Sequence, residues 1–413
     1  MDRIISLCGL IAMVALAWSL SENRRRVDWR LVGIGMGLQA ALALLVLRTG
    51  FGDWFFGAVR VVFDTLTDAS NQGAGFVFGN LIHPFTLKQD AMVDADGPLF
   101  VNGVLAFSVL PTIIVVSSLA GILYHLGVIQ AAVRALAYLM QRTLRTSGAE
   151  TFGTAILVFM GVESMPTLKG YLRTMTRSAL LTVMTAFLST VAANVMLIYA
   201  TFGAEPGNLL AASLMSAPAA ILLAKIMIPE TETPATLGTG RIEVEVESHN
   251  VIDGAARGAS EGVLLALNVG ALLIAFISLV YLINLGFLAV LNMSFTEIMG
   301  FVFRPFAFLM GIPREDIGEV STLLGTKTII NEFIAYSDLS TLIEHNALQP
   351  RSVTITTYAL CGFANPGSLG ILIAALAGLV PERRKDITQL GVKSLIAGTL
   401  ATFMTACIAG ILA

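Results

Sequence analysis

Charged residues are scarce in this sequence: Asp, Glu, Lys and Arg together make up 13% of its 413 residues. Apolar residues make up 56%, and the mean hydropathy is +0.81. A soluble globular domain needs more charge than this to cover its surface, so the composition argues against that class. The charges that are present sum to −3 and are not gathered into a basic face, which argues against a nucleic-acid partner.

Cysteine and histidine are also rare. The three cysteines, Cys8, Cys361 and Cys407, lie in separate apolar stretches without a CxxC spacing, and the four histidines lack partners at metal-ligand spacing. The histidines also lack the neighbours that a membrane-embedded hydrolase would need. We therefore expect neither an enzyme nor a protein with a bound cofactor.

Long apolar stretches dominate what is present. A helix rises about 1.5 Å per residue and must cross roughly 30 Å of hydrocarbon, so about 20 apolar residues suffice for one span. Eight stretches qualify as spans, at about 4–20, 31–48, 101–124, 178–200, 208–228, 262–291, 352–380 and 390–412. Three others, 51–66, 128–144 and 298–312, mix apolar and charged residues as interfacial helices do. The pattern predicts an all-α polytopic membrane protein.

Basic residues indicate how the spans are oriented. Arg24, Arg25 and Arg26 follow the first stretch, which is read as a retained span, and Arg383 and Arg384 precede the last. Cytoplasmic loops are enriched in Lys and Arg, so both loops are expected in the cytoplasm and both termini outside.

Two further stretches, 148–172 and 316–338, are apolar but interrupted near the middle, which predicts two re-entrant hairpins. In the first, Gly161 and Pro166 bracket Glu163, a carboxylate that costs roughly 2.5–3.5 kcal/mol to insert at membrane depth. Proline removes a helical hydrogen bond, so a hairpin tip or broken helix is expected there. Glu163 is then either a functional carboxylate of a binding site or a carboxylate neutralised by a structural partner.

The second hairpin carries Glu332, with Asn331 beside it and Lys327 five residues earlier. An ion pair between Lys327 and Glu332 is the simplest structural explanation. The donor and acceptor of Asn331 suit the hydroxyl groups of a polar ligand better, so we favour a ligand-binding role.

Asn365, Pro366, Gly367 and Ser368 interrupt the 352–380 stretch with turn-forming residues. The pattern predicts a discontinuous helix rather than a simple proline kink. Half-helix ends and unwound carbonyls form the midplane sites of many secondary transporters.

The segments 148–228 and 316–412 each read as a broken hairpin followed by two spans, in opposite orientations, which predicts an inverted repeat. The expected organisation is a scaffold and oligomerisation region at 1–144, a first transport repeat at 145–228, a cytoplasmic loop at 229–260, a scaffold span and interfacial helix at 261–315, and a second transport repeat at 316–413.

Ordered segments along nearly the whole chain resemble the concentrative nucleoside transporter family of bacterial type. They are Leu20–Arg25 with Trp29 and Arg30, Phe76–Gly79, Phe107–Pro111, Thr146–Glu150, Ser216–Ala219, Leu265–Ala271, Gly325–Lys327, Asn331–Phe333 and Ala359–Asn365. The resemblance implies a homotrimer in the cytoplasmic (inner) membrane, with eight spans and two re-entrant hairpins per subunit. It also implies nucleoside import by symport with Na⁺ or protons, through an elevator movement of the transport domain.

Carried over residue by residue, the resemblance implies that Glu332, Asn365 and Ser368 hold the ribose hydroxyls, with Asn331 nearby, and that Phe363 packs against the nucleoside. Thr190 falls where the family places a hydroxyl ligand of sodium. Val191, Met160 and Glu163 complete the candidate set for that ion.

The first hairpin tip departs from the family pattern Gly-Gln-Thr-Glu-Ala-Pro. Val162 stands where a base-binding glutamine is expected, Glu163 where a threonine shared by base and sodium is expected, and Ser164 where a base-reading glutamate is expected. Leu157 also replaces an asparagine of the usual sodium site. Pro366 and Gly367 replace a phenylalanine and a serine in the broken helix. The sugar half of the site is therefore better kept than the base half.

Glu163 leaves the coupling ion open, because a carboxylate can strengthen a sodium site or itself bind the coupling proton. The sequence predicts a cation-coupled secondary transporter for nucleosides. The alternative within the fold is another ribosyl or sugar-like cargo. No feature of the sequence favours a receptor, and the two broken hairpins suit alternating access better than the permanent pore of a channel.

Overall fold

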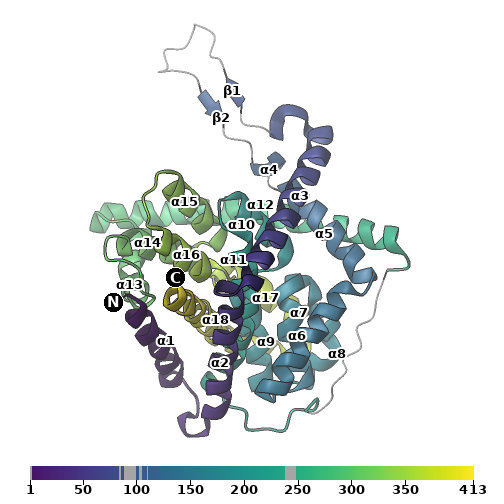
Figure 1. Ribbon diagram of the computed structural model, residues 1–413, viewed down its shortest axis with the longest axis vertical. Helices are drawn as coiled ribbons and strands as arrows, with labels where there is room; N and C mark the ends of the chain where they lie inside the picture. Colours follow the sequence, from purple (N-terminus) through teal and green to yellow (C-terminus); the bar gives the residue numbers. More distant parts are fainter. Residues whose placement is uncertain (1, 83–84, 88–98, 102–104, 109, 238–247) are drawn as a thin grey trace.

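The computed structural model describes residues 2–82, 85–87, 99–101, 105–108, 110–237 and 248–413 (Figure 1). Helices form a bundle, and two short antiparallel strands, β1 (Phe85–Leu87) and β2 (Leu99–Val101), lie above it in the view. The chain ends meet, since a guanidinium nitrogen of Arg3 donates a 2.7 Å hydrogen bond to the carbonyl of Ala413. Part of the predicted 229–260 loop, residues 238–247, lies outside the described residues.

The part of the chain before the first hairpin supplies long helices and short connections. These are α1 (Asp2–Ser19), η1 (Arg24–Arg26), α2 (Trp29–Leu47), α3 (Gly50–Phe78), η2 (Gly79–Ile82), α4 (Leu105–Ser108), α5 (Leu110–His125) and α6 (Val128–Leu144). The predicted interfacial segment 128–144 is α6. The predicted segment 51–66 is only the first part of α3, which continues to Phe78.

The two predicted repeats share one order of elements, namely a hairpin, a broken helix and a long helix. The first consists of α7 (Gly148–Met160), η3 (Gly161–Leu168), α8 (Lys169–Leu172), α9 (Arg177–Ser189), α10 (Ala193–Thr201) and α11 (Pro206–Met227). The second consists of α14 (Ile317–Ile329), α15 (Glu332–Glu344), α16 (Pro350–Leu360), α17 (Pro366–Leu379), η4 (Pro381–Arg383) and α18 (Arg384–Leu412). Between them lie α12 (Val251–Leu291) and α13 (Phe295–Leu309). The start of α12 falls within the segment predicted as a loop.

Six continuous segments among the described residues are long and apolar enough to cross a membrane: α1, α2, the stretch from Gly148 to Leu172, α11, α12 and the stretch from Pro381 to Leu412. The bent pair α5 and α6 adds a seventh if it is counted as one span. The predicted spans at 178–200 and 352–380 are helical but fail this test of length, because each is divided into two shorter helices. The prediction of a helical polytopic membrane protein is confirmed.

Continuity of the 178–200 span was predicted wrongly, because the chain breaks between Ser189 and Ala193. Ser213 of α11 compensates for the break. Its hydroxyl accepts a 3.0 Å hydrogen bond from the amide of Val191 and lies 3.1 Å from the Val191 carbonyl. Backbone groups freed from a helix in lipid need such partners. No proline or glycine lies at this break, and the group that satisfies its freed backbone comes from a different helix.

The segment from Gly148 to Leu172 folds back on itself, although its length alone would allow a span. A Cβ atom on Gly153 would lie 3.0 Å from the Leu168 side chain, and fifteen residues of straight helix would separate these positions by about 22 Å. The reversal begins at Gly161, whose φ of +63° is a left-handed conformation that favours glycine. The predicted hairpin, with Gly161 at its tip, is therefore present.

The core lies around the long helices of the repeats, while α12 lies at the edge. In the most apolar part of α11, 89% of residues are buried, against 17% in α12. The main packing partner of α12 is α5, and glycines allow the two backbones to approach closely. A Cβ atom on Gly121 or Gly258 would lie 2.2 Å from a carbonyl oxygen of the opposite helix.

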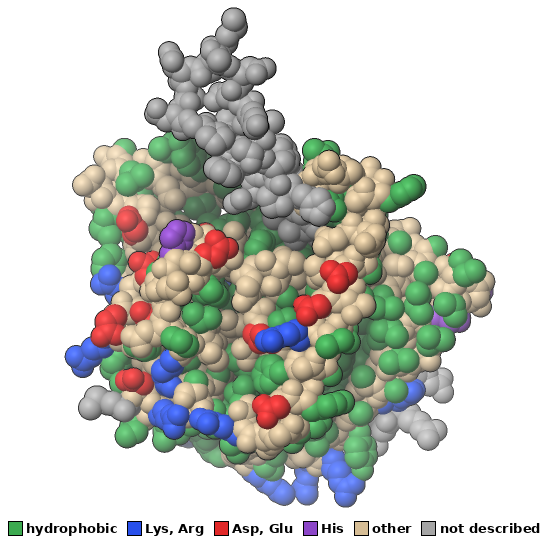
Figure 2. All heavy atoms as spheres, turned by 45° about the horizontal axis from the view of Figure 1, so that its top comes forward, with side chains coloured by type: hydrophobic (Ala, Val, Ile, Leu, Met, Phe, Trp, Pro, Cys, Tyr) green, Lys and Arg blue, Asp and Glu red, His purple; other side chains and the backbone are tan. Residues whose placement is uncertain are grey.

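Hydrophobic side chains are spread over the face shown in Figure 2, and many Lys and Arg side chains lie along its lower edge. The connection between α1 and α2, which holds η1 (Arg24–Arg26), lies at the same lower end in Figure 1. On this face, many of the basic residues therefore lie at the end of the bundle that holds the connection between α1 and α2.

Candidate functional site

Two asparagines begin the helices that build the candidate site. Asn331 adopts an extended conformation before α15, and its side-chain oxygen accepts a 3.0 Å hydrogen bond from the amide of Ile334. Asn365 does the same before α17, accepting a 2.8 Å bond from the amide of Ser368. Asparagine is among the best residues at this capping position, and Pro366 suits the first turn that follows. The predicted break at 363–368 is confirmed.

The carboxylate of Glu332 is the point at which three elements meet. One oxygen accepts a 2.8 Å hydrogen bond from the hydroxyl of Tyr199 in α10, and the other accepts a 2.8 Å bond from the amide nitrogen of Asn365. Glu332 is 6% exposed and Asn365 1%. Sequence reasoning singled out Glu332 and Asn365 but missed Tyr199. The only available signal was that a tyrosine within a span needs a partner for its hydroxyl.

Lys327 and Glu332 have different hydrogen-bond partners, contrary to the simplest structural explanation of this pair. The ammonium of Lys327 donates to the Ala359 carbonyl at 2.9 Å and to the Thr402 hydroxyl at 3.0 Å. Glu332 instead uses neutral donors, which a hydroxyl-rich ligand can replace.

Aromatic rings support this carboxylate. Tyr199 stacks on Tyr336 with ring centroids 4.5 Å apart, and Phe333 meets Tyr199 edge-on at 6.4 Å. Phe363, expected to pack against a nucleoside, lies 5.7 Å from the ring of Phe187 in α9. The predicted roles of Phe363 and Ser368 in binding stay predictions.

The altered tip of the first hairpin places its three unusual residues in different surroundings. Val162 packs against the apolar core, and the buried hydroxyl of Ser164 donates a 2.7 Å hydrogen bond to the carbonyl of Gly161. Glu163 lines a cavity of about 190 Å³, whose described lining comes from the hairpin tip, from α5, from α12 and from Ser248 just before it. The tip also packs against α17, so both halves of the candidate site adjoin this half-helix.

Oxygen atoms gather at the end of α9, where the family resemblance implies a sodium ligand. The Thr190 hydroxyl donates a 2.8 Å hydrogen bond to the Ala186 carbonyl and lies 3.4 Å from the Leu157 carbonyl. Val191 follows in the break, and Met160 ends α7. Hard cations favour oxygen ligands of this kind, and the carbonyl of Leu157 contributes one despite the loss of the family's asparagine.

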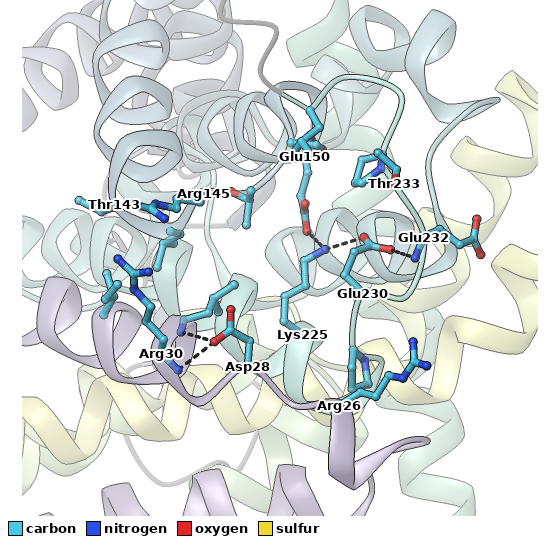
Figure 3. Close-up of a pocket in the computed structure, with 18 residues that line it drawn as sticks. Arg26, Asp28, Arg30, Thr143, Arg145, Glu150, Lys225, Glu230, Glu232 and Thr233 are labelled. Carbon is cyan, nitrogen blue, oxygen red and sulfur yellow. Dashed lines mark hydrogen bonds and ion pairs between the residues drawn. The ribbon is translucent and has the colours of Figure 1, made fainter.

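A second cavity, of about 340 Å³, lies beside the start of α2 and the start of α7 (Figure 3). Lys225 of α11 extends between two carboxylates, Glu150 at 2.9 Å and Glu230 at 3.0 Å. Glu230 also accepts a 2.8 Å hydrogen bond from the hydroxyl of Thr176, the cap of α9. Sequence reasoning did not single out this cluster, which links the start of the first hairpin to the start of α9 and the end of α11.

Comparisons with known proteins cover nearly the whole chain. Residues 8–81 match the family model of the Na⁺-dependent nucleoside transporter N-terminus, residues 106–206 a model described as nucleoside recognition, and residues 208–410 the Na⁺-dependent nucleoside transporter C-terminus. The protein named Uncharacterized transporter YutK of Bacillus subtilis is 37% identical, with 99% of each chain covered. The chain belongs to the concentrative nucleoside transporter family. It is a membrane transporter and not an enzyme.

Two further proteins are similar to this chain over its whole length. Mouse solute carrier family 28 member 3 is 39% identical over the whole of this chain, which spans 59% of that relative's length. The structure of CNTnw in an inward-facing, substrate-bound state is 36% identical with a TM-score of 0.89, covering 100% of this chain and 99% of that one. The first predicted repeat, up to the start of α11, falls within the nucleoside recognition match. The second repeat falls within the C-terminal match, which also covers α11.

Proposed function

We propose that this transporter imports nucleosides across the cytoplasmic membrane by symport with Na⁺, with Glu332 as the central sugar ligand. The observation that carries the proposal is the buried Glu332 carboxylate, held by Tyr199 and Asn365 where hairpin, α10 and α17 meet. A ribose presents two neighbouring hydroxyl donors, which match the two oxygens of a carboxylate. Asn365 contacts this carboxylate directly, Asn331 and Ser368 lie next to Glu332 and near Asn365, respectively, in the sequence and complete the proposed sugar site, and Phe363 packs against the bound nucleoside.

The coupling ion binds at the end of α9 in this proposal. Thr190, Val191 and Met160 supply oxygens there with the Leu157 carbonyl, and the family description as Na⁺-dependent supports sodium over protons. Glu163, three residues after Met160 at the hairpin tip, is proposed to add negative charge to this site.

Alternating access in this proposal is a movement of the two repeats past the other elements, which include α5 and α12. We assign 145–228 and 316–413 to a transport domain that moves past a scaffold drawn from 1–144 and 261–315, with 229–260 as the cytoplasmic connection. The cavity beside Glu163 lies on this boundary, between the hairpin tip and α12. The basic end of the bundle faces the cytoplasm, so both termini lie outside.

The homotrimer is carried over from the family resemblance, and the exposed apolar face of α12 is a surface that lipid or a neighbouring copy would cover. Leu267 is 65% exposed and Ile274 73% exposed on this helix. Apolar surface of this extent is covered by lipid or by a neighbouring copy. Mass measurement of the protein in nanodiscs tests the trimer.

A second cargo class is favoured by the tip of the first hairpin. Val162 carries no hydrogen-bonding group for a base, and the Ser164 hydroxyl is already engaged with Gly161. A ribosyl or sugar-like compound without a standard base is therefore the second candidate.

The test is uptake of a panel of radiolabelled nucleosides into proteoliposomes, with a sodium gradient or a proton gradient imposed separately. We expect one or more nucleosides to accumulate under the sodium gradient, and Glu332→Gln to abolish uptake. Glu344→Gln, on the exposed end of the same helix, is the matched control and should transport normally. Failure of every nucleoside under both gradients in folded protein would overturn the nucleoside assignment in favour of the second cargo class.

A further inference from the structure

Lys327 is a fully buried ammonium group that the proposed nucleoside site does not use. It lies in the last turn of α14 with 0% of its surface exposed. Its two hydrogen-bond acceptors are the Ala359 carbonyl and the Thr402 hydroxyl, and its nitrogen lies 5.9 Å from the centre of the Phe403 ring. All three contacts present electron-rich atoms, and all three are uncharged. A buried cation in such surroundings requires a specific reason.

The end of α16 supplies such a reason. This half-helix stops at Leu360, so the carbonyls of its last turn lack helical partners and carry the negative end of the helix dipole. Ala359 is the last residue but one of the helix. The ammonium of Lys327 therefore places a positive charge directly at this negative end, at membrane depth.

The first repeat has the same architecture with different chemistry. The first arm of its hairpin, α7, reaches the end of the half-helix α9, as α14 reaches the end of α16. Leu157 lies four residues before the cap Gly161, and Lys327 lies three residues before the cap Ile330. At the end of α9 this arm contributes a carbonyl, which lies 3.4 Å from the Thr190 hydroxyl. Oxygens alone thus meet at one half-helix end, and oxygens with an ammonium meet at the other.

We propose that Lys327 is a built-in cation, which takes in the second repeat the position that a coupling cation takes in the first. The comparison with the first repeat rests on the proposed coupling-ion site, whereas the contacts of Lys327 do not. The lysine stays in place throughout the cycle, so the end of α16 binds no exchangeable ion. Only the end of α9 is then left for a cation that is carried and released.

Thermal unfolding of the purified protein tests this without any substrate. Lys327→Ala removes the charge and opens space for a small cation, so unfolding is compared in methylammonium, sodium and choline chlorides at equal ionic strength. We expect the variant to unfold at a lower temperature than wild type in choline, and methylammonium to raise its melting temperature saturably by a few degrees. Wild type should show no response to methylammonium.

Lys327→Met is the matched control, because methionine fills the space without a charge and should also show no response. A missing methylammonium response in Lys327→Ala, or an equal response in wild type or Lys327→Met, would overturn the proposal. Failure of nucleoside uptake by wild type would leave these results unchanged, so the two proposals fail separately.

A second pair of variants applies if Lys327→Ala yields no folded protein. Lys327→Arg keeps the charge, and Lys327→Gln keeps a donor for Ala359 without the charge. Recovery of folded Lys327→Arg together with loss or destabilisation of Lys327→Gln supports a requirement for charge. Lys327→Gln as stable as wild type would show that the site needs only a hydrogen-bond donor, and the proposal would fall.

Discussion

Tyr199 of the first repeat donates a 2.8 Å hydrogen bond to Glu332 of the second, across 133 positions of the chain. Tyr199 is fully buried, and its ring stacks on Tyr336, which follows Glu332 in the same helix. The bond therefore links the second half of one broken helix to the tip of the opposite hairpin.

Tyr199→Phe should destabilise the protein, because it leaves one oxygen of a buried carboxylate without its donor while keeping the ring in place. A hydrogen bond to a charged group contributes about 1.5–3 kcal/mol. The melting temperature in detergent measures the loss. Tyr281→Phe, on the exposed face of α12, is the control and should leave it unchanged. Equal melting temperatures of the two variants would contradict the prediction.

Asn365→Asp should be far more disruptive than Asn331→Asp, although both variants keep a capping oxygen for their helix. The side-chain amide nitrogen of Asn365 donates to Glu332, so an aspartate at this position would place a second buried carboxylate against that of Glu332. We expect this repulsion to cost about 3 kcal/mol of folding stability. The Asn331 side chain serves as the cap of α15. The two variants are compared by the fraction of monodisperse protein recovered and by melting temperature. The same loss in both would show that the cap, and not the carboxylate contact, is the sensitive feature.

Gly258→Ala should push α5 and α12 apart, because the new Cβ atom would lie 2.2 Å from the Ser117 carbonyl oxygen. Overpacking of this kind costs about 1–3 kcal/mol. Gly286→Ala, in the same helix but with open space around it, is the matched control. Thermal unfolding of both variants tests the close packing, and a normal melting temperature for Gly258→Ala would argue against it.

Glu22, in the connection between α1 and α2, should contribute stability that depends on pH. Partial burial alone would raise the pKa of Glu22, but the hydrogen bond and charge of Lys393 and the charge of Arg177 outweigh it and lower the pKa. A lowered pKa in the folded state means that this stability is present above about pH 4.5 and is lost as the pH falls further.

Glu22→Gln should therefore cost less than about 1 kcal/mol at pH 7, a modest amount because the pair is partly exposed. The difference from wild type should vanish as the pH falls towards 3. Melting temperatures across this pH range provide the measurement. A constant difference at every pH would mean that the charge of Glu22 is not what stabilises the connection.

Much of the architecture could be predicted from sequence because lipid imposes a strict rule on composition and length. The apolar stretches located the helices, and the hairpin tip at Gly161 and the break at Asn365 could be seen because glycine, proline and asparagine alter the backbone locally. The family resemblance, carried by ordered motifs, was confirmed by the comparisons.

The break at Thr190 could not be predicted in the same way. Its local sequence is compatible with a continuous helix, and the hydroxyl of Ser213, from the next helix, is what satisfies Val191. Tyr199 was missed for a similar reason, since its partner lies in the other repeat.

The sequence by itself determined that this chain is an integral membrane protein with two interrupted hairpins and a broken helix, because those properties depend on composition and on local backbone chemistry. Only the tertiary structure decided which buried charge meets which partner. Lys327 and Glu332 are five residues apart, yet the fold sends the ammonium to the end of α16 and the carboxylate to Tyr199 and Asn365. Partners of buried polar groups are set by packing between elements distant in the chain, which spacing along a sequence does not record.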